Sequence, residues 1–441
     1  MPMKTISNNN LSGNIIIPIL VVGTFLLIGF FLLKKTQRIE RVNIFSQEMS
    51  IDTVTDSRAL GYAGQRKIVK DYRGNIFLSY RKDYQKNAEI FVAKVSSDSN
   101  LLHLSGTDTP IAVVDQNNDQ RVPSLAVDAR NTVHAIWYGS DTPSAKNNRQ
   151  IKYTRRTISA EKWEGWRNIA YVSGYNNDDF WQEHPMLLVG KDNTLYATWE
   201  GKDEQNKKQQ IKFAKSENGG TIWSKWKNIE PTKNNTQSRP TMLEDENGTI
   251  FLFMYSSQGT ENDLQQIQYA VSSDKGETWT PWQLISDPAF DARHISATVD
   301  ETGRIHVAWR AKTSPDGPSQ IIYRTFFANR WSDSLPVFPS ANYQFFPTIG
   351  VTDSGIVHVA WMENSDASEF PRENPAGGTG LVAFLKNGKF KTPQSLSPQN
   401  NVLYPNVSEK IDDENIIPLL YAQDQGNKQF SLKLKFLDES K

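Results

Sequence analysis

The chain has 441 residues, with 49 basic and 49 acidic side chains, 38% hydrophobic residues and no cysteine. Balanced charge provides no electrostatic footprint for nucleic acid, and the lack of cysteine excludes disulfide scaffolds, thiol nucleophiles and Cys-ligated metal sites. At about 150 residues per domain, the length fits two or three domains or one large repetitive domain. Internal repeats are therefore the first pattern to test.

An uncharged apolar run, IIIPILVVGTFLLIGFFLL, occupies residues 15–33. A helix of this length covers about 28 Å, close to the roughly 30 Å hydrocarbon core of a bilayer. A cleaved signal peptide is the alternative, but its apolar region would be shorter, and here Lys34 and Lys35 follow the run directly. We therefore predict a single transmembrane helix at 15–33, between an N-terminal tail at 1–14 and a juxtamembrane linker at 34–41.

The charges that flank this run give conflicting indications of orientation. Only Lys4 precedes it, whereas Lys34, Lys35, Arg38 and Arg41 follow. The positive-inside rule would place the C-terminal part in the cytoplasm. Against this, an N-terminal anchor on a Trp- and Asn-rich β domain more often presents that domain outside the cell, and this is the orientation we expect.

After residue 66, a pattern of two apolar strands around a D-x-x-G turn, or a relative of it, recurs to the C-terminus. The second strand ends in Trp or Tyr, as in PSLAVDARNTVHAIWY and ISATVDETGRIHVAWR. The copies begin at Lys67, Pro123, Pro185, Pro240, Ile295 and Pro347, and a worn seventh lies around Asn406 to Tyr421. The spacing of about 52 to 62 residues is the size of a propeller blade.

The residues at the turns and after them complete a four-stranded repeat. Asp at the first turn position with Gly or Asn at the fourth, as in Asp71 and Gly74, suits a type I turn followed by a left-handed residue. A third strand begins at Gln150, Gln210, Gln266 and Gln320, and a fourth follows a turn. We predict an all-β fold at 42–438, a β-propeller of seven four-stranded blades in which residues 42–53 supply the outer strand of the last blade. Six blades remain the alternative if the seventh copy packs elsewhere.

Two turns between third and fourth strands carry the most specific motif, SSDKGETW at 272–279 and the looser SENGGTIW at 216–223. The first matches S-x-D-x-G-x-T-W fully, and it resembles the Asp box of the sialidase (neuraminidase) superfamily and related Asp-box (BNR) repeat propellers. In that family the box is a structural turn away from the ligand. An Asp that accepts backbone N–H bonds and a Trp that covers a hairpin agree with such a role.

Most tryptophans and histidines occupy repeated positions, which favours structural roles. Trp137, Trp199, Trp309 and Trp361 end second strands and are expected in the core. His134, His306 and His358 share one position in three blades, so we expect packing between blades rather than metal coordination. No H-E-x-x-H, P-loop or G-x-S-x-G motif is present, and neither a metal nor a cofactor is expected.

Arginines gather where the first strands begin, at the axial end of each blade. Arg66, Arg121, Arg239 and Arg293 lie within two residues of this point, and the position after the second-strand Trp or Tyr adds Arg81, Tyr138, Glu200, Tyr255 and Arg310. A ring of guanidinium groups suits a carboxylate or a phosphate. The alternative is that each Arg pairs with an acid such as Glu183, Glu200 or Glu363 and only makes the tunnel rigid.

Trp181 is the one tryptophan outside the repeated positions, in the polar loop YNNDDFWQEHP that leads to Glu183 and His184. If this loop overhangs the funnel, Trp181 can stack on a sugar or insert into a partner. The predicted ligand site therefore comprises Arg66, Arg121, Arg239, Arg293, Arg310, Trp181, Glu183 and Tyr138.

The family resemblance implies a test for catalysis. Sialidases hold a sialic-acid carboxylate with three arginines, the first in an R-I-P motif that Arg121-Val122-Pro123 matches. They also use an Asp acid/base and a Tyr nucleophile assisted by Glu, for which Asp178 or Asp179, Tyr404 and Glu363 are residues of the right type without a motif. However, a whole repeat precedes Arg121, and seven blades differ from the six of that family.

Three hypotheses about function follow. The first is a membrane-anchored propeller that binds an anionic glycan or a protein partner through its axial face, without catalysis. The second is an accessory subunit of a membrane complex, and the third is an exo-sialidase or related glycoside hydrolase. No catalytic residue is assigned, and nucleic acid is not expected as a partner.

Overall fold

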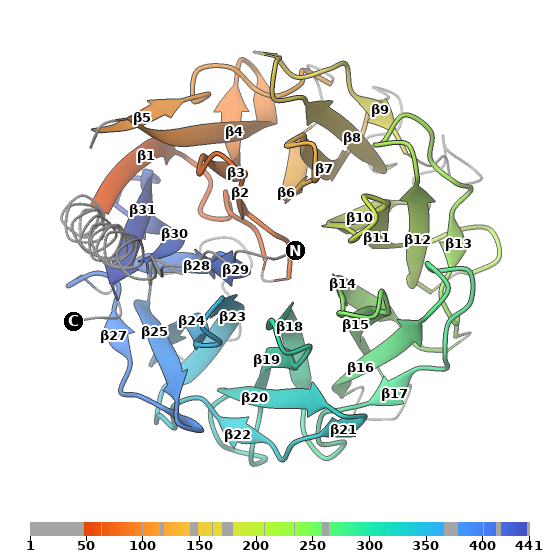
Figure 1. The fold of residues 1–441 in the computed structure, drawn as a ribbon. Coiled ribbons are helices and arrows are strands. Elements are labelled where there is room, and N and C mark those ends of the chain that lie inside the picture. The colour runs from red at the N-terminus through yellow and green to blue at the C-terminus, as the bar shows by residue number, and fades with distance from the viewer. Residues whose placement is uncertain are drawn as a thin grey trace, which may run out of the picture.

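The computed structural model describes residues 48–438, with gaps at 63, 99–100, 115–118, 142–148, 161, 170–179, 207, 233, 258–263, 366–377, 400 and 412–415. The described chain forms seven sheets arranged as blades around a central axis, and their strands are antiparallel apart from the β23–β29 pair (Tyr343–Thr352 and Lys410–Ile411; Figure 1). The predicted all-β propeller of seven blades is confirmed, and the six-bladed alternative is wrong because the worn seventh repeat forms a blade of its own.

The blades follow one another around the ring in chain order, and the innermost strand comes first in each of blades 1 to 6. Blade 1 consists of β2 (Ile68–Lys70), β3 (Ile76–Tyr84), β4 (Asn87–Asp98) and β5 (Leu101–Ser105). Blade 2 consists of β6 (Gln120–Val127), β7 (Val133–Gly139), β8 (Gln150–Arg156) and β9 (Arg167–Asn168). Blade 3 consists of β10 (Gln182–Val189), β11 (Leu195–Gly201), β12 (Gln210–Ser216) and β13 (Lys227–Asn228).

The remaining four blades complete the ring. Blade 4 consists of β14 (Gln237–Glu244), β15 (Ile250–Ser257), β16 (Gln265–Ser272) and β17 (Gln283–Leu284). Blade 5 consists of β18 (Ala292–Val299), β19 (Ile305–Ala311), β20 (Gln320–Phe327), β21 (Arg330–Trp331) and β22 (Leu335–Pro336). Blade 6 consists of β23 (Tyr343–Thr352), β24 (Val357–Asn364), β25 (Thr379–Lys386), β26 (Lys389–Phe390) and β27 (Gln394–Ser395), and β29 (Lys410–Ile411) pairs with β23. Blade 7 consists of β28 (Val402–Val407), β30 (Ile416–Asp424), β31 (Phe430–Asp438) and β1 (Glu48–Val54).

The second strands are buried on both faces because neighbouring blades pack face to face. Every residue of β7, β11 and β19 is buried. Trp137, Trp199, Trp309 and Trp361 are at most 1% exposed and belong to clusters that extend from one blade to the next. The expectation that these tryptophans form the core is confirmed.

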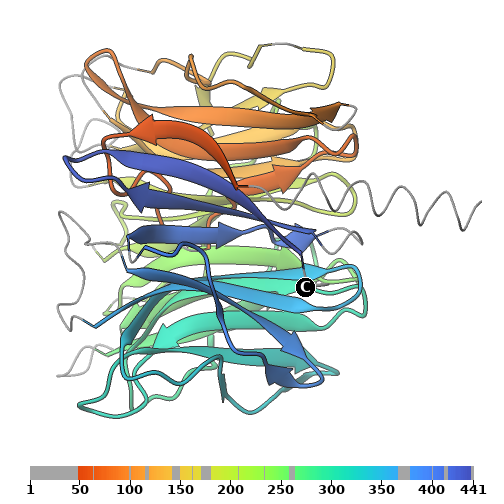
Figure 2. The ribbon, with the colours of Figure 1, turned by 90° about the vertical axis from the view of Figure 1, so that its left-hand side faces the viewer.

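The ring is closed by pairing the first described strand with the last. β1 runs antiparallel to β31, in a register from Glu48 opposite Lys435 to Val54 opposite Phe430 (Figure 2). The predicted closing strand is confirmed for its described part, whereas residues 42–47 lie outside the described residues. The last blade therefore combines strands from the two ends of the propeller.

The predicted tail, transmembrane helix and linker at 1–14, 15–33 and 34–41 also lie outside the described residues. Among the residues that the structure does describe, no helix is long and apolar enough to cross a bilayer. Membrane attachment through 15–33 stays a prediction.

The turns between first and second strands adopt the predicted conformation. Gly74 and Asn131 have φ of 81° and 64°, and the carboxylate of Asp71 accepts hydrogen bonds from the backbone N–H groups of Arg73 and Asn75, both at 2.9 Å. These turns also connect blades, because the Asn131 side chain accepts the backbone N–H of Tyr72 at 2.8 Å. Asn131, the residue with positive φ, thus completes the hairpin of blade 2 and links it to the hairpin of blade 1.

His134 and His306 are buried on second strands that contact the next blade, and their hydrogen bonds are made within their own blade. His134 Nδ1 lies 2.7 Å from the hydroxyl of Tyr153, and His306 Nδ1 lies 2.6 Å from that of Tyr323. The Tyr lies on the neighbouring strand of the same sheet in both cases. His358 is also buried and contacts Phe384 of the same blade edge to face, at 5.1 Å between centroids.

Each Asp-box turn covers the third strand of the preceding blade. Trp279 packs edge-on against Phe213 at 5.4 Å, and Trp223 packs edge-on against Tyr153 at 5.3 Å. Within the complete box, Asp274 accepts hydrogen bonds from Ser272 Oγ at 2.8 Å and from the backbone N–H of Thr278 at 2.9 Å. The boxes therefore stabilise contacts between blades far from the axis.

We predict that Asp274→Ala lowers the free energy of unfolding by about 1 kcal/mol, because Asp274 is exposed and each lost hydrogen bond contributes about 0.5 to 1.5 kcal/mol. Asp274→Asn should retain most of this stability, since Asn218 accepts the backbone N–H of Ile222 at 2.8 Å in the other box.

The difference between wild type and Asp274→Ala should also depend on pH. Hydrogen bonds from Thr278 lower the pKa of Asp274 from 3.8 to about 2, so the stabilisation is present above the higher value and is lost as the pH falls towards the lower. Urea unfolding at neutral and acidic pH measures the difference, and an equal loss in the Asn and Ala variants would contradict the assigned role.

Candidate functional site

A β-bulge near the start of the innermost strand aims one residue of each of six blades at the axis. The ladder of blades 2 to 7 shifts register there, and the bulged residue has a φ between 48° and 59°. These bulge residues are Val122, His184, Arg239, His294, Phe346 and Tyr404. All but His294 precede a proline, which cannot donate a ladder hydrogen bond and so favours an interruption at this point.

Tyr62 fills the middle of the ring that these bulge residues form. Its ring lies 5.3 Å from that of His184, 6.1 Å from that of His294 and 6.3 Å from that of Tyr404, measured between centroids. The guanidinium of Arg239 stands 4.5 Å from the centroid of the same ring. Tyr62 belongs to the segment that leaves β1 and enters the middle of the propeller, so the axis is plugged here (Figure 1).

A cavity of about 170 Å³ lies beside this plug, at the end of the ring where the innermost strands begin. Blades 1 to 4 contribute to its wall, together with the segment that follows β1. The charged and aromatic side chains that line it are Asp56, Arg58, Tyr62, Arg81, Arg121, Tyr138, Arg149, Glu183, His184 and Arg239.

Four of the five arginines in this wall are paired with acids. Arg81 pairs with Asp56 and also with Asp119, at 2.7 Å from the latter. Arg121 reaches the same Asp119 at a longer 3.3 Å, and its side chain is 38% exposed. Asp119 is thus shared between two guanidinium groups.

Blade 3 supplies the acids that hold the remaining paired arginines. Arg149 pairs with Glu183, and Arg239 pairs with Glu200 at 2.6 Å. The fifth guanidinium, that of Arg58, has no acidic partner among the described residues. In the described part of the chain, the cavity wall is therefore a network of guanidinium and carboxylate groups with one guanidinium in excess. This agrees in part with the alternative drawn from the sequence, in which each arginine pairs with an acid.

His184 and Glu200 form a buried pair at the base of the cavity. Glu200 Oε1 lies 2.9 Å from His184 Nδ1, and both side chains are at most 4% exposed. Burial and then Arg239 lower the pKa of His184 from 6.5 to about 4. Burial acts to raise the pKa of Glu200, but Arg239 and His184 outweigh it and hold that pKa below its usual range.

These pKa directions define the protonation states at neutral pH. Two groups contact Nδ1 of neutral His184: the carboxylate of Glu200, which can only accept, and the guanidinium of Arg239, which can only donate. One ring nitrogen carries the proton and the other keeps a lone pair, and these contacts are compatible with either arrangement. A neutral imidazole that is oriented by a carboxylate can act as a base.

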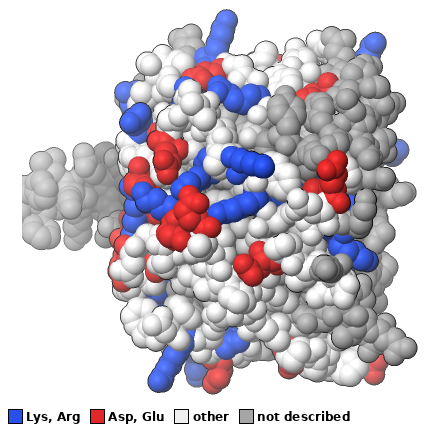
Figure 3. All heavy atoms as spheres, turned by 90° about the vertical axis from the view of Figure 1, so that its right-hand side faces the viewer, with Lys and Arg blue, Asp and Glu red and all other residues white. Residues whose placement is uncertain are grey.

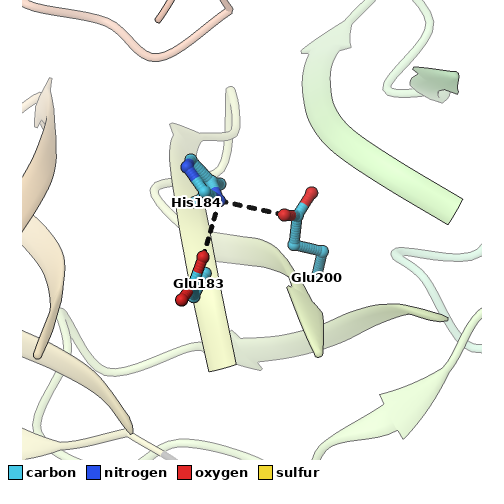
Figure 4. Close-up of side chains that lie close together, drawn as sticks. All are labelled: Glu183, His184 and Glu200. Carbon is cyan, nitrogen blue, oxygen red and sulfur yellow. Dashed lines mark hydrogen bonds and ion pairs between the residues drawn. The ribbon is translucent and has the colours of Figure 1, made fainter. Parts of the chain in front are cut away.

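The two acids and the histidine also form a group that could offer three ligand atoms to a metal, all within 4.8 Å of one another (Figure 4). However, Arg149 and Arg239 already pair with the two carboxylates. A divalent cation would have to displace both guanidinium groups, so the electrostatic surroundings favour an anion at this site.

The structure brings together four of the eight predicted site residues. Arg121, Tyr138, Glu183 and Arg239 all line the cavity. Tyr138 lies opposite Arg121 in the ladder, and its ring centroid is 5.2 Å from that of His184. Whether these residues bind a ligand stays a prediction.

The other four predicted residues lie outside the cavity. Arg66 binds Glu409 at 2.7 Å and the carbonyl oxygen of Met242 at 3.2 Å, further along the axis. Arg293 and Arg310 both pair with Asp291 in blade 5. Trp181 is half-buried, and Lys202 stands 5.7 Å from its ring centroid.

The position relative to the bulge explains why Arg66 separates from Arg239. Arg239 is itself a bulge residue, whereas Arg66 corresponds to the proline that follows the bulge in other blades. Arg121 and Arg293 both precede a bulge, but Arg293 belongs to blade 5, which does not line the cavity. Successive residues of a strand point to opposite faces, so an offset of one residue changes the direction of the side chain. Aligning the repeats by their turns would have revealed this offset.

The residues suggested by analogy with sialidases do not converge on the cavity. Asp178 and Asp179 lie outside the described residues. Tyr404 is a bulge residue buried against Phe346, at 4.6 Å between centroids. Glu363 accepts hydrogen bonds from Ser340 and Asn342 in blade 6.

Sequence reasoning missed Asp56, Arg58, Tyr62 and Arg149 as members of the site. The first three belong to the segment between β1 and β2, which carries no repeat signal. Arg149 immediately precedes β8, so its proximity to the third-strand motif was the only available signal.

The described residues on one side of the outer wall show both signs of charge (Figure 3). On the side of the ring that carries β9 and β13, blue and red residues are interspersed (Figure 3). Contacts such as Lys275 with Asp192 at 2.6 Å and Lys215 with Glu277 at 2.7 Å account for part of this pattern. The arginine-lined cavity is therefore distinct from that wall.

Comparison with known proteins identifies the class of fold. Residues 193–346 match the BNR repeat-like domain, and no curated protein matches the chain in sequence. Together with the Asp-box turns, this match confirms the resemblance to Asp-box propellers, and the chain has a sialidase-like BNR β-propeller fold.

Solved structures with this fold include enzymes that act on polysaccharides. One is a polysaccharide lyase, an ulvan lyase bound to -[GlcA(1-4)Rha3S]-, with a TM-score of 0.61 at 11% identity. The match covers 90% of this chain and 95% of the lyase chain. The polysaccharide lyase Uly1 has a TM-score of 0.56 at 12% identity, covering 89% and 99%. The Hadza microbial sialidase Hz136 has a TM-score of 0.51 at 12% identity, covering 82% and 74%. At such identities the likeness concerns the fold alone.

We predict that His184 remains neutral down to about pH 4, which makes stability depend on pH. The unfolded chain takes up a proton near pH 6.5, whereas the folded chain does so near its lowered pKa of about 4. Protonation of the unfolded chain therefore destabilises the fold as the pH falls between these values, by roughly 3 kcal/mol, since each pKa unit corresponds to about 1.4 kcal/mol.

NMR titration of His184 measures its pKa directly, and denaturant unfolding of wild type and His184→Gln measures the linkage. The variant cannot titrate at this position, so its stability relative to wild type should increase as the pH falls from 7 to 4. A His184 signal that titrates near 6.5 would contradict the prediction.

Proposed function

We propose that the propeller binds an acidic glycan through the axial cavity and that a sugar carboxylate contacts the arginine network. The supporting observation is the cavity of about 170 Å³ into which five arginines and two tyrosines converge. Guanidinium groups donate paired, permanently charged hydrogen bonds that match the geometry of a carboxylate. The aromatic rings of Tyr62 and Tyr138 offer apolar surface for a sugar ring beside them.

The electrostatics support binding of an anion over a neutral sugar. His184 is neutral at physiological pH, so the charged groups of the wall are the arginines and their acids. Arg121 is 38% exposed and shares its acid with Arg81, so it can turn part of its guanidinium to a ligand. A ligand carboxylate would replace water there without leaving a buried charge unpaired.

Membrane attachment through residues 15–33 is part of the same proposal, and we propose that the propeller lies outside the cell. Its support is the uncharged apolar run in the sequence. An anchored receptor would then present its cavity to glycans at the cell surface.

We expect Arg121→Ala to weaken binding of an acidic sugar about tenfold or more, because a charge-assisted hydrogen bond contributes about 1.5 to 3 kcal/mol. Calorimetric titration with 3′-sialyllactose and with a glucuronate oligosaccharide measures the affinity, and lactose and glucose oligomers serve as neutral controls. Arg130→Ala is the matched protein control, since Arg130 is an exposed arginine of the same blade, in the β6–β7 turn at the opposite end of the strand.

Other outcomes would favour the alternative functions. Equal binding of acidic and neutral sugars would contradict the proposal. Hydrolysis of a fluorogenic sialoside that Arg121→Ala abolishes would support an exo-sialidase. No binding of any sugar, together with co-purification of membrane subunits that Arg121→Ala releases, would support an accessory subunit.

A second candidate function, elimination at a uronate unit, is favoured by the His184–Glu200 pair. In this reaction a base removes the C5 proton, the C4–O bond breaks, a C4=C5 double bond forms, and the leaving oxygen takes up a proton. Neutral His184 suits the base, and the hydroxyl of Tyr138, whose ring is 5.2 Å away, suits the acid. The arginines would neutralise the uronate carboxylate and so make C5 more acidic.

We expect, if this candidate holds, that wild type generates the ultraviolet absorbance of an unsaturated uronate from a glucuronate polymer. His184→Gln should lower the rate at least a hundredfold, the lower end of the contribution of general base catalysis. Binding of the polymer by this variant serves as the control for folding. Binding by wild type without a rise in absorbance would exclude lyase activity on that polymer.

A further inference from the structure

Arg58 differs from the other arginines of the cavity in having no acid partner among the described residues. The other four, Arg81, Arg121, Arg149 and Arg239, contact four carboxylates, those of Asp56, Asp119, Glu183 and Glu200. Because His184 is neutral, five guanidinium groups face four carboxylates among the residues that the structure describes, and one positive charge remains in that set. The guanidinium that carries this excess is that of Arg58.

Arg58 is carried by a segment that the repeats do not contain. We call residues 55–62 the axial strap, since they connect the ring-closing strand β1 to Tyr62 on the axis. The strap is folded on itself, with the N–H of Ala59 bonded to the carbonyl of Asp56 at 3.1 Å and that of Gly61 to the carbonyl of Arg58 at 2.9 Å. These two bonds hold Arg58 in a pair of consecutive turns.

Blade 1 and the axis fix the two ends of the axial strap. Arg81 pairs with Asp56 by its side chain and donates its backbone N–H to the carbonyl of Ala59 at 2.9 Å. At the other end, Tyr62 contacts His184 and Arg239, which belong to blade 3 and blade 4. The position of Arg58 therefore depends on β1 being in place only four residues earlier.

We propose that Arg58 is the primary contact of the bound acidic group and that the axial strap couples occupancy of the cavity to closure of the ring. The inference rests on the proposed binding of an acidic glycan and deepens it. A ligand carboxylate that bonds to Arg58 completes an ion pair, whereas bonding to Arg149 or Arg239 requires competition with an existing carboxylate.

Ligand binding is coupled to ring closure because the chain runs directly from β1 into the axial strap. When β1 detaches from β31, the axial strap loses its fixed end and Arg58 leaves its position. A ligand that binds only the closed ring stabilises it by mass action, and the coupling is reciprocal. Local opening of β1 should therefore become rarer as the ligand concentration rises.

The experiment compares wild type, Arg58→Ala and Arg58→Lys in titrations with 3′-sialyllactose and the glucuronate oligosaccharide. We expect Arg58→Ala to raise the dissociation constant about tenfold to a hundredfold and Arg58→Lys to restore part of the affinity. Arg73→Ala is the matched control, because Arg73 is an exposed arginine in the β2–β3 turn, away from the cavity. Thermal unfolding of each variant checks that it folds.

Hydrogen exchange tests the coupling on the same samples. At a ligand concentration ten times the dissociation constant, exchange of the β1 amides in wild type should slow about tenfold. At that concentration Arg58→Ala should show little slowing, and exchange in the outer strand β13 serves as an internal control.

The outcomes distinguish this inference from the proposed function. If wild type binds the acidic sugars and Arg58→Ala binds them equally well, the role of Arg58 is overturned and the proposed function stands. If Arg58→Ala weakens binding but exchange at β1 does not respond to the ligand, the coupling is overturned. If wild type binds neither acidic sugar, the proposed function fails and the inference fails with it.

Discussion

The pairing of β1 with β31 is the contact on which both the ring and its cavity depend. Seven blades that contact only their neighbours would leave the first and last joined by side chains alone. The backbone ladder from Glu48–Lys435 to Val54–Phe430 joins the two ends of the propeller within one sheet. Because the chain passes from this ladder directly to the axis, closing the ring also delivers Asp56, Arg58 and Tyr62 to the cavity.

The bulges of the innermost strands decide what the axis contains. A regular strand would point alternate residues towards the neighbouring blades, whereas each bulge directs one residue to the centre. Blades 3 and 4 place His184 and Arg239 there, and blades 6 and 7 place Phe346 and Tyr404. The axis is thus polar on one side of Tyr62 and aromatic on the other, which confines the cavity to the side of blades 1 to 4.

The sequence predicted the repeated features of the fold and missed what the repeats do not contain. Turn residues such as Asp71 and Gly74, the second-strand tryptophans and the Asp box have local causes, and each was predicted correctly. The gathering of Arg121, Tyr138, Glu183 and Arg239 was also anticipated, because these residues occupy equivalent ends of neighbouring blades. Arg66 and Arg293 were grouped with them because proximity to the start of a strand gives neither the direction of a side chain nor the blades that line the cavity. The axial strap escaped notice because long-range connectivity, and no local pattern, brings it to the site.

The direction of β1 has a consequence for how the propeller is held. The strand runs towards the cavity, since Val54 precedes Asp56 by two residues, so Glu48 lies at the far end, about 20 Å away at ~3.3 Å per residue. The antiparallel β31 ends near the same place, because Lys435 is opposite Glu48 (Figure 2). Both ends of the propeller therefore emerge on the side opposite the cavity. A tether joined at Glu48 would therefore attach to the side of the ring opposite the cavity. The mouth of the cavity would face away from the attachment point and be open to large polymers that cannot approach the tethered side.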